Sequence, residues 1–97
     1  MPIVVTVRIP NVDIERVRQV AKDHKDLSDK LRESIIRNGC TAHRRIYNEE
    51  LREIMDVDEW ESEEGVRQFL KEMGPTIAKL AELRGTGKPE DTIWRVY

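Results

Sequence analysis

Hydrophobic and polar positions alternate in some segments of this chain and recur every three or four residues in others. Residues 2–9 are rich in β-branched side chains, which predicts a strand. Residues 41–47 and 51–60 are predicted to form two further strands, joined by a turn at 48–50. Residues 92–97 are predicted to form a last strand, after a loop that contains Gly and Pro.

Two helical regions separate these strands. Apolar residues recur at threes and fours over residues 12–38, which predicts one long amphipathic helix. Ser62 is the predicted N-cap of the second helical region, and Gly74-Pro75 is predicted to divide that region before the helix resumes. The order β-α-β-β-α-β predicts a ferredoxin-like α+β fold that spans residues 1–97 as a single domain, with one antiparallel sheet and both helices on one face.

The alternation along the strands assigns each side chain to one of two sheet faces. The face predicted to lie under the helices is apolar and consists of Ile3, Val5, Val7, Ile9, Ala42, Ile46, Met55 and Val57. The opposite face is predicted to carry Thr6, Arg8, His43, Arg45, Tyr47, Ile54, Asp56, Asp58 and Trp60. The pattern of the last strand does not determine which of its side chains point to which face. A helix-free face of this composition is either wet or packed against a second copy, and the second arrangement makes a polar cavity with aromatic walls.

Composition narrows the possible partners. The chain has 97 residues, of which 38% are hydrophobic and 37% charged, as expected of a small, well-solvated protein. A net charge of -2 with mixed signs gives no electrostatic case for nucleic acid or an anionic membrane as partner. The N-terminal segment lacks the features of a secretory signal, and Cys40 is the only cysteine, so a reducing, cytoplasmic location is expected.

The segment 58–62 reads D-E-W-E-S and joins the third predicted strand to the second helical region. This corner and the element order resemble the dimeric α/β-barrel superfamily, and most closely its antibiotic-biosynthesis-monooxygenase-like group of small proteins. The resemblance implies a homodimer, formed through sheet faces or strand edges, with a ligand cavity between sheet and helices. Superfamily members include cofactor-free oxygenases of phenolic substrates, which implies a small aromatic ligand and no cofactor.

The haem-degrading branch of the superfamily combines an Asn on the first strand, a Trp at the corner and a His on the second helix. Trp60 matches the corner position. The first predicted strand carries Thr6 and Arg8 but no Asn, and residues 63–83 contain no His. The resemblance therefore does not extend to haem degradation.

Three residues are candidates for a catalytic role, and each has a simpler structural interpretation. Trp60 can form the wall of a cavity for a planar ring, or it can be a packing residue at the corner. His43 can act as a base near neutral pH, or it can pair with Asp56 or Asp58 at a surface or an interface. Arg45 can bind a phenolate or carboxylate, or it can pair with the same aspartates across the sheet.

Five further residues are candidates for ligand binding, namely Thr6, Arg8, His24, Tyr47 and Asp58. Arg8 and Tyr47 offer donors for the same anionic group as Arg45. His24 continues the apolar stripe of the first helix, so it is either a half-buried residue at a helix–sheet boundary or part of the cavity lining. His24 and His43 lie on different predicted elements without a paired spacing, and no metal site is predicted.

These residues are compatible with three kinds of function. A cofactor-independent monooxygenase would remove a proton from a phenol-like substrate, which supplies the electrons, and would stabilise the resulting anion. A non-catalytic protein could use the same cavity to bind a small ligand, and a structural dimer would need no ligand. The resemblance favours the first of these functions.

Overall fold

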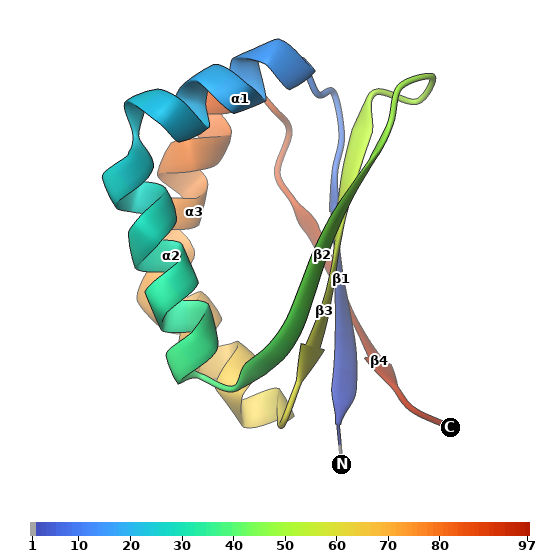
Figure 1. Ribbon diagram of the computed structural model, residues 1–97. Coiled ribbons are helices and arrows are strands. Elements are labelled where there is room, and N and C mark those ends of the chain that lie inside the picture. The colour runs from blue at the N-terminus through green and yellow to red at the C-terminus, as the bar shows by residue number, and fades with distance from the viewer. Residues whose placement is uncertain (1) are drawn as a thin grey trace.

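The computed structural model describes residues 2–97 and forms an antiparallel sheet covered by helices on one face (Figure 1). The strands are β1 (Ile3–Ile9), β2 (Cys40–Asn48), β3 (Glu53–Trp60) and β4 (Glu90–Arg95). The helices are α1 (Ile14–Asp23), α2 (Lys25–Arg37) and α3 (Glu63–Arg84). The strand order is β2-β3-β1-β4, and each neighbouring pair is antiparallel. This arrangement confirms the predicted ferredoxin-like fold.

The first helical region consists of two helices, where the sequence pattern predicts one long helix. His24 separates α1 from α2 with φ of -124° and ψ of 45°, outside the helical range. It lies within residues 22–26, a wholly polar run that interrupts the apolar stripe. Because no apolar side chain in this run binds the chain to the sheet, α1 and α2 take different directions and bend around the sheet (Figure 1).

α3 is one continuous helix, whereas the sequence predicts a division at Gly74-Pro75. The Ser62 side chain accepts a hydrogen bond from the backbone N–H of Gly65, which confirms the predicted N-cap. Pro75 lies inside the helix, where it removes one backbone donor, but Gly74 has no side chain to collide with the proline ring. The helix ends at Gly85, whose φ of 69° is left-handed. Neither α3 nor any other helix within residues 2–97 is long and apolar enough to cross a membrane.

The faces of β1 are as predicted, but those of β2 and β3 are reversed. Residues directly opposite each other in an antiparallel pair point to the same face. Opposite Ile3, Val5, Val7 and Ile9 of β1 lie Trp60, Asp58, Asp56 and Ile54 of β3, all on the helix-facing side. Met55 and Val57, predicted to lie under the helices, are on the helix-free face together with Ala42 and Ile46 of β2. On β4, the pairing with β1 places Ile93 and Arg95 on the helix-facing side, and Thr92 and Trp94 on the other.

The reversal has a physical cause. Pattern rules place apolar residues inside because an unpaired buried charge is costly. In this fold Asp56 and Asp58 are buried, with 8% and 5% of their surfaces exposed, because β2 provides a charged or polar partner opposite each one. The pattern of β3 alone does not reveal such partners.

Two hydrophobic clusters lie between the sheet and the helices, at opposite ends of β3. One consists of Ile3, Val5, Trp60 and Val66, and the other of Ile9, Val12, Val17 and Ile54. Asp56 and Asp58 lie between these ends along β3. The middle of the helix-facing side is therefore polar, although apolar packing closes it at both ends.

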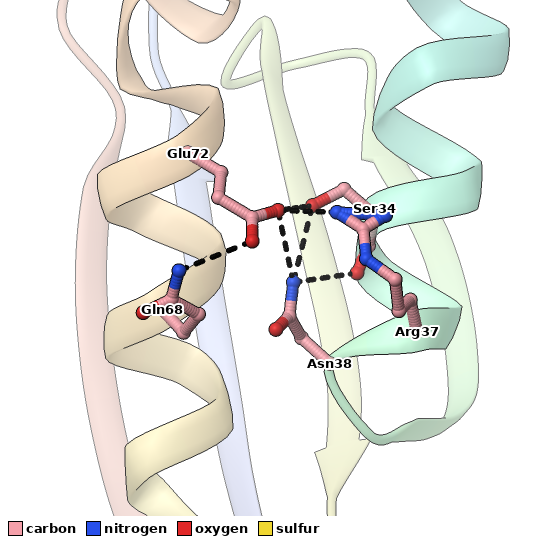
Figure 2. A network of polar contacts seen from close by, with 5 residues as sticks. All are labelled: Ser34, Arg37, Asn38, Gln68 and Glu72. Carbon is pink, nitrogen blue, oxygen red and sulfur yellow. Dashed lines mark hydrogen bonds and ion pairs between the residues drawn. The ribbon is translucent and has the colours of Figure 1, made fainter.

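A polar network joins the end of α2 to α3 (Figure 2). Glu72 of α3 accepts hydrogen bonds from Ser34, Arg37 and Asn38, and from Gln68 of its own helix. These bonds, that from Gln68 above all, lower the pKa of Glu72 to about 2. The network holds the two helices together in addition to the apolar cluster that includes Val66 and packs against Ile35 and Phe69.

Candidate functional site

β2 and β3 bring several of the predicted site residues to the helix-facing side of the sheet. The directly opposed pairs are His43 with Asp58, Arg45 with Asp56, and Tyr47 with Ile54. Residues at alternate positions of a strand share a face, so the pattern groups these side chains correctly. They nevertheless lie on the helix-facing side, where the β2 residues themselves stay exposed, whereas the sequence places them on the helix-free face.

Arg45 and Asp56 form a bidentate ion pair across the two strands. Arg45 donates from Nε to Oδ1 of Asp56 at 2.6 Å and from Nη2 to Oδ2 at 2.8 Å. These hydrogen bonds raise the pKa of Arg45 above its ordinary value. The parallel donors fix both side chains in one geometry and neutralise the buried carboxylate.

His43 and Asp58 form the second pair, through Nδ1 of the imidazole and Oδ1 of the carboxylate. Burial raises the pKa of Asp58, and the nearby Asp56 adds to this effect, whereas the bond from His43 opposes it. The His43 side chain is 49% exposed, so the pair connects a buried carboxylate to a solvent-accessible imidazole. A carboxylate bonded to one ring nitrogen orients the imidazole, which leaves Nε2 for proton transfer.

The structure adds Arg84, a residue that the sequence analysis does not select. Arg84 lies in the last turn of α3, four residues after the buried Leu80 and three after the buried Ala81. This spacing places it on the stripe of α3 that packs toward the sheet. A charged residue on a buried stripe is the signal that identifies it, but the predicted helix ends just before this position.

The charges of the Arg45–Asp56 pair act on Arg84. Burial lowers the pKa of Arg84, repulsion from Arg45 lowers it further, and attraction to Asp56 opposes the change. The Nε atom of Arg84 is buried and has no hydrogen-bond acceptor within residues 2–97. We call the group formed by His43, Arg45, Asp56, Asp58 and Arg84 the charged centre.

Trp60 closes one end of the helix-facing side. It is 2% exposed and belongs to the hydrophobic cluster that includes Val66. Its ring lies 5.5 Å from that of Phe69 between centroids, at an interplanar angle of 50°. The Nε1 donor of Trp60 is buried without an acceptor in the described part of the chain. Trp60 therefore packs at the corner, and its role as a wall for a ligand stays a prediction.

Three other predicted residues lie apart from the charged centre. Thr6 and Arg8 are on the helix-free face, where the Oγ1 of Thr6 accepts a hydrogen bond from Nε1 of Trp94 at 2.9 Å. Arg8 forms an ion pair with Glu53 on that same face. His24 is half-buried at the junction of α1 and α2. Their contribution to ligand binding stays a prediction.

Other parts of the described chain are weaker candidates for a functional site. No group of three His, Cys, Asp or Glu side chains within residues 2–97 could hold a metal ion. An open hollow of about 420 Å³ lies at the start of α3, with Ile3, Ser62 and Arg95 in its lining. Its lining includes the exposed ion pair of Arg95 with Glu63, whereas the charged centre combines buried charges with shifted pKa values. Such a combination is typical of functional sites, so the charged centre is the stronger candidate.

Comparison with known proteins places this fold among known structures. The chain matches no protein-family model, and no curated protein is significantly similar to it. Among solved structures, a monooxygenase of Streptomyces coelicolor in complex with nanaomycin D is similar with a TM-score of 0.72 and 18% identity, over 98% of this chain and 87% of that one. A dimeric ferredoxin-like protein from an uncultured marine organism has a TM-score of 0.72 and 17% identity, over 99% of this chain and 88% of that one.

A third similar structure is SnoaB, a cofactor-independent oxygenase from Streptomyces nogalater. Its TM-score is 0.69 at 14% identity, over 99% of this chain and 93% of that one. At these sequence identities the similarity establishes the fold but not the reaction, which has to be argued from the residues of the site. The chain therefore has the same fold as these monooxygenases and the dimeric ferredoxin-like protein, as the resemblance of its sequence implies.

Proposed function

We propose that this protein is a cofactor-independent monooxygenase that acts on a small phenolic substrate in the charged centre. The observation that carries the proposal is the pair formed by the half-exposed His43 and the buried Asp58. An imidazole oriented by a carboxylate is suited to remove a proton from a phenol near neutral pH. The monooxygenases among the similar structures support the same class of reaction.

The reaction needs a base and a partner for the anion. Nε2 of His43 accepts the phenol proton, and Asp58 stabilises the imidazolium that forms. The phenolate is electron-rich and reduces O2. One oxygen atom enters the ring as a carbonyl, two hydrogens leave the substrate, and the second oxygen departs as water. The positive charge of Arg45 stabilises the anion before oxygen is consumed.

Oxygen uptake by the purified protein, with a panel of phenols and naphthols, tests the proposal. We expect substrate-dependent uptake by the wild-type protein and a loss of about 100-fold or more in His43→Gln. Arg18→Gln is the matched control, because Arg18 is an exposed arginine of α1 that pairs with Glu15 on the surface. If the His43→Gln variant took up oxygen as fast as the wild-type protein, the proposed role of His43 as the base would be contradicted. Ligand binding without any uptake would instead favour the alternative, a non-catalytic binding protein.

We also propose that the protein is a homodimer that packs through the helix-free face. This face carries Val4, Ala42, Ile46, Met55, Val57 and Trp94, and the helices leave it uncovered. Arg44 and Thr6 lie directly opposite Val57 on this face, so its apolar side chains stand among polar ones. Exposed apolar side chains bordered by polar residues are typical of an interface. The dimeric ferredoxin-like protein among the similar structures supports this assembly.

A further inference from the structure

The helix-free face of the sheet carries charges of both signs. Three of them pair with one another, because Arg8 forms ion pairs with Glu53 and with Glu90. Arg44 of β2 and Glu59 of β3 lie on the same face, and both are exposed. Neither of these two forms an ion pair within residues 2–97. The face therefore presents a cation and an anion that the described chain leaves without a partner.

Arg44 and Glu59 are near neighbours on this face. Arg44 is directly opposite Val57, and Glu59 lies two residues further along β3. Side chains in such diagonal positions of an antiparallel pair are within reach of each other. The two side chains nevertheless form no ion pair with each other, so each is available to a group outside the chain.

The proposed homodimer would cover both charges, and an unpaired charge at an interface is costly. In a two-fold dimer, a contact from one residue to a second residue of the partner is always accompanied by the reverse contact. A cation and an anion side by side on one face can therefore form two ion pairs when the axis passes between them. The other diagonal of this group consists of Ala42 and Val57. Because both residues nearest the axis are apolar, no like charges meet there.

We propose that Arg44 of each copy pairs with the partner's Glu59, so that the helix-free face selects a second copy of this chain through its charges. This inference rests on the homodimer proposed above and deepens it by naming the contact that sets its register. Charge complementarity across an interface is a common source of such specificity. The competing explanation is that both residues are solvated surface charges, which contribute little. Under that explanation, reversal of either charge would leave the assembly unchanged.

Sedimentation of charge-reversed variants at micromolar concentration tests the pairing. Arg44→Glu brings two acids together twice in the dimer, and Glu59→Arg does the same with two arginines. We expect each variant to dissociate with a Kd about tenfold or more above that of the wild-type protein. The double variant that carries both changes restores opposite charges at each contact and should dimerise like the wild-type protein.

A mixture of the two single variants separates pairing between chains from pairing within one chain. The double variant would also restore a pair within a chain, whereas the mixture cannot. In the mixture one chain carries two acids at the paired positions and the other carries two arginines. We therefore expect equal amounts of the Arg44→Glu and Glu59→Arg proteins to form a heterodimer, although each alone is mainly monomeric.

Arg32→Glu is the matched control, because Arg32 is an exposed arginine of α2, away from the helix-free face. It changes the net charge as Arg44→Glu does and should leave the dimer unchanged. Single variants that dimerise like the wild-type protein, or a mixture that stays monomeric, would overturn the pairing and leave the proposed homodimer standing. A monomeric wild-type protein would overturn both.

Circular dichroism verifies that each variant keeps the fold. If a charge-reversed variant does not fold, Arg44→Gln, Glu59→Gln and the variant with both changes provide a second test. Either change removes the same two ion pairs, so the double variant should dimerise no more weakly than the weaker single variant. Losses of affinity that simply add would overturn the pairing.

Discussion

At the scale of single residues, Asp58 illustrates a conflict between stability and chemistry. Burial raises its pKa, so the ionised carboxylate is less favourable in the folded protein than in the unfolded chain. This penalty is present at neutral pH and disappears as the pH falls and the carboxyl group becomes protonated in both states. We expect Asp58→Asn to raise the stability at pH 7 by on the order of 1 kcal/mol and to reduce oxygen uptake.

Thermal melts of the Asp58→Asn variant and the wild-type protein at pH 7 and at pH 4 check this prediction. The gain in melting temperature should be larger at pH 7, where the wild-type carboxylate is ionised. A variant that melts below the wild-type protein at both values would show that the bond to His43 outweighs the cost of burial.

Two glycines of α3 differ sharply in their surroundings. A Cβ added at Gly65 would lie 2.0 Å from the backbone oxygen of Asn38, so the end of α2 leaves no room for a side chain. A Cβ at Gly74 would meet nothing within 4 Å. We expect Gly65→Ala to destabilise the fold by about 1–3 kcal/mol through overpacking. Gly74→Ala should change the stability less than Gly65→Ala, because alanine restricts the unfolded chain but also places a Cβ beside the ring of Pro75.

Urea unfolding of the two alanine variants against the wild-type protein measures both changes. The Gly74 variant serves as the control for a Gly-to-Ala change in the same helix. Equal stabilities of the two variants would contradict the close approach of α2 and α3 at Gly65.

At the scale of elements, the Glu72 network controls how α2 and α3 stay together. The pKa of Glu72 is lowered from 4.5 to about 2, so its ionised form stabilises the fold at any pH above the ordinary value. This contribution is lost as the pH falls from about 5 to about 2. We expect Glu72→Gln to lower the melting temperature at pH 7 and to approach the wild-type value near pH 2.

A series of melts between pH 7 and pH 2 tests this pH dependence. Glu33→Gln, an exposed acid on α2, is the control and should follow the wild-type curve. A constant difference between Glu72→Gln and the wild-type protein across the series would show that the network does not depend on the charge of Glu72.

The elements also show what a sequence pattern can and cannot predict. The spacing of apolar residues and the turn and capping residues between segments predict the order of strands and helices, because each segment carries these features locally. The bend at His24 follows from the polar run 22–26, and the continuous helix through Pro75 is possible because Gly74 has no side chain, two local features that the apolar period alone does not capture. The faces of β3 depend on partners from another strand, since Arg45 and His43 make the burial of two carboxylates possible. The pattern fails at the charged centre, because two carboxylates that face the helices are paired by residues of another strand.

The candidate site residues also differ in whether the sequence alone could identify them. His43, Arg45 and Asp58 were identifiable because alternate positions of a strand share a face, whichever face that is. Arg84 was not, because its stripe on α3 becomes visible only when the helix is known to extend to it. The absence of an acceptor for its Nε is a property of the packed structure and has no sequence signal.

At the scale of the whole molecule, the two faces of the sheet have opposite character. The helix-facing side carries the charged centre between two apolar ends, and the helix-free face carries exposed apolar side chains among polar ones. Trp94 on this face is 55% exposed, and Ile46 is 49% exposed. Such a surface is costly to leave in water, and a second copy offers the same surface in return.

We therefore expect the wild-type protein to sediment as a dimer at micromolar concentration. Val57→Lys places a charge in the middle of the helix-free face and should shift the protein toward the monomer, because an unpaired charge at an interface is costly. Leu70→Lys is the matched control, since Leu70 is a partly exposed apolar residue on α3. Circular dichroism of both variants verifies that the fold is kept. A wild-type monomer, or a Val57→Lys variant that remains dimeric, would rule out this face as the interface.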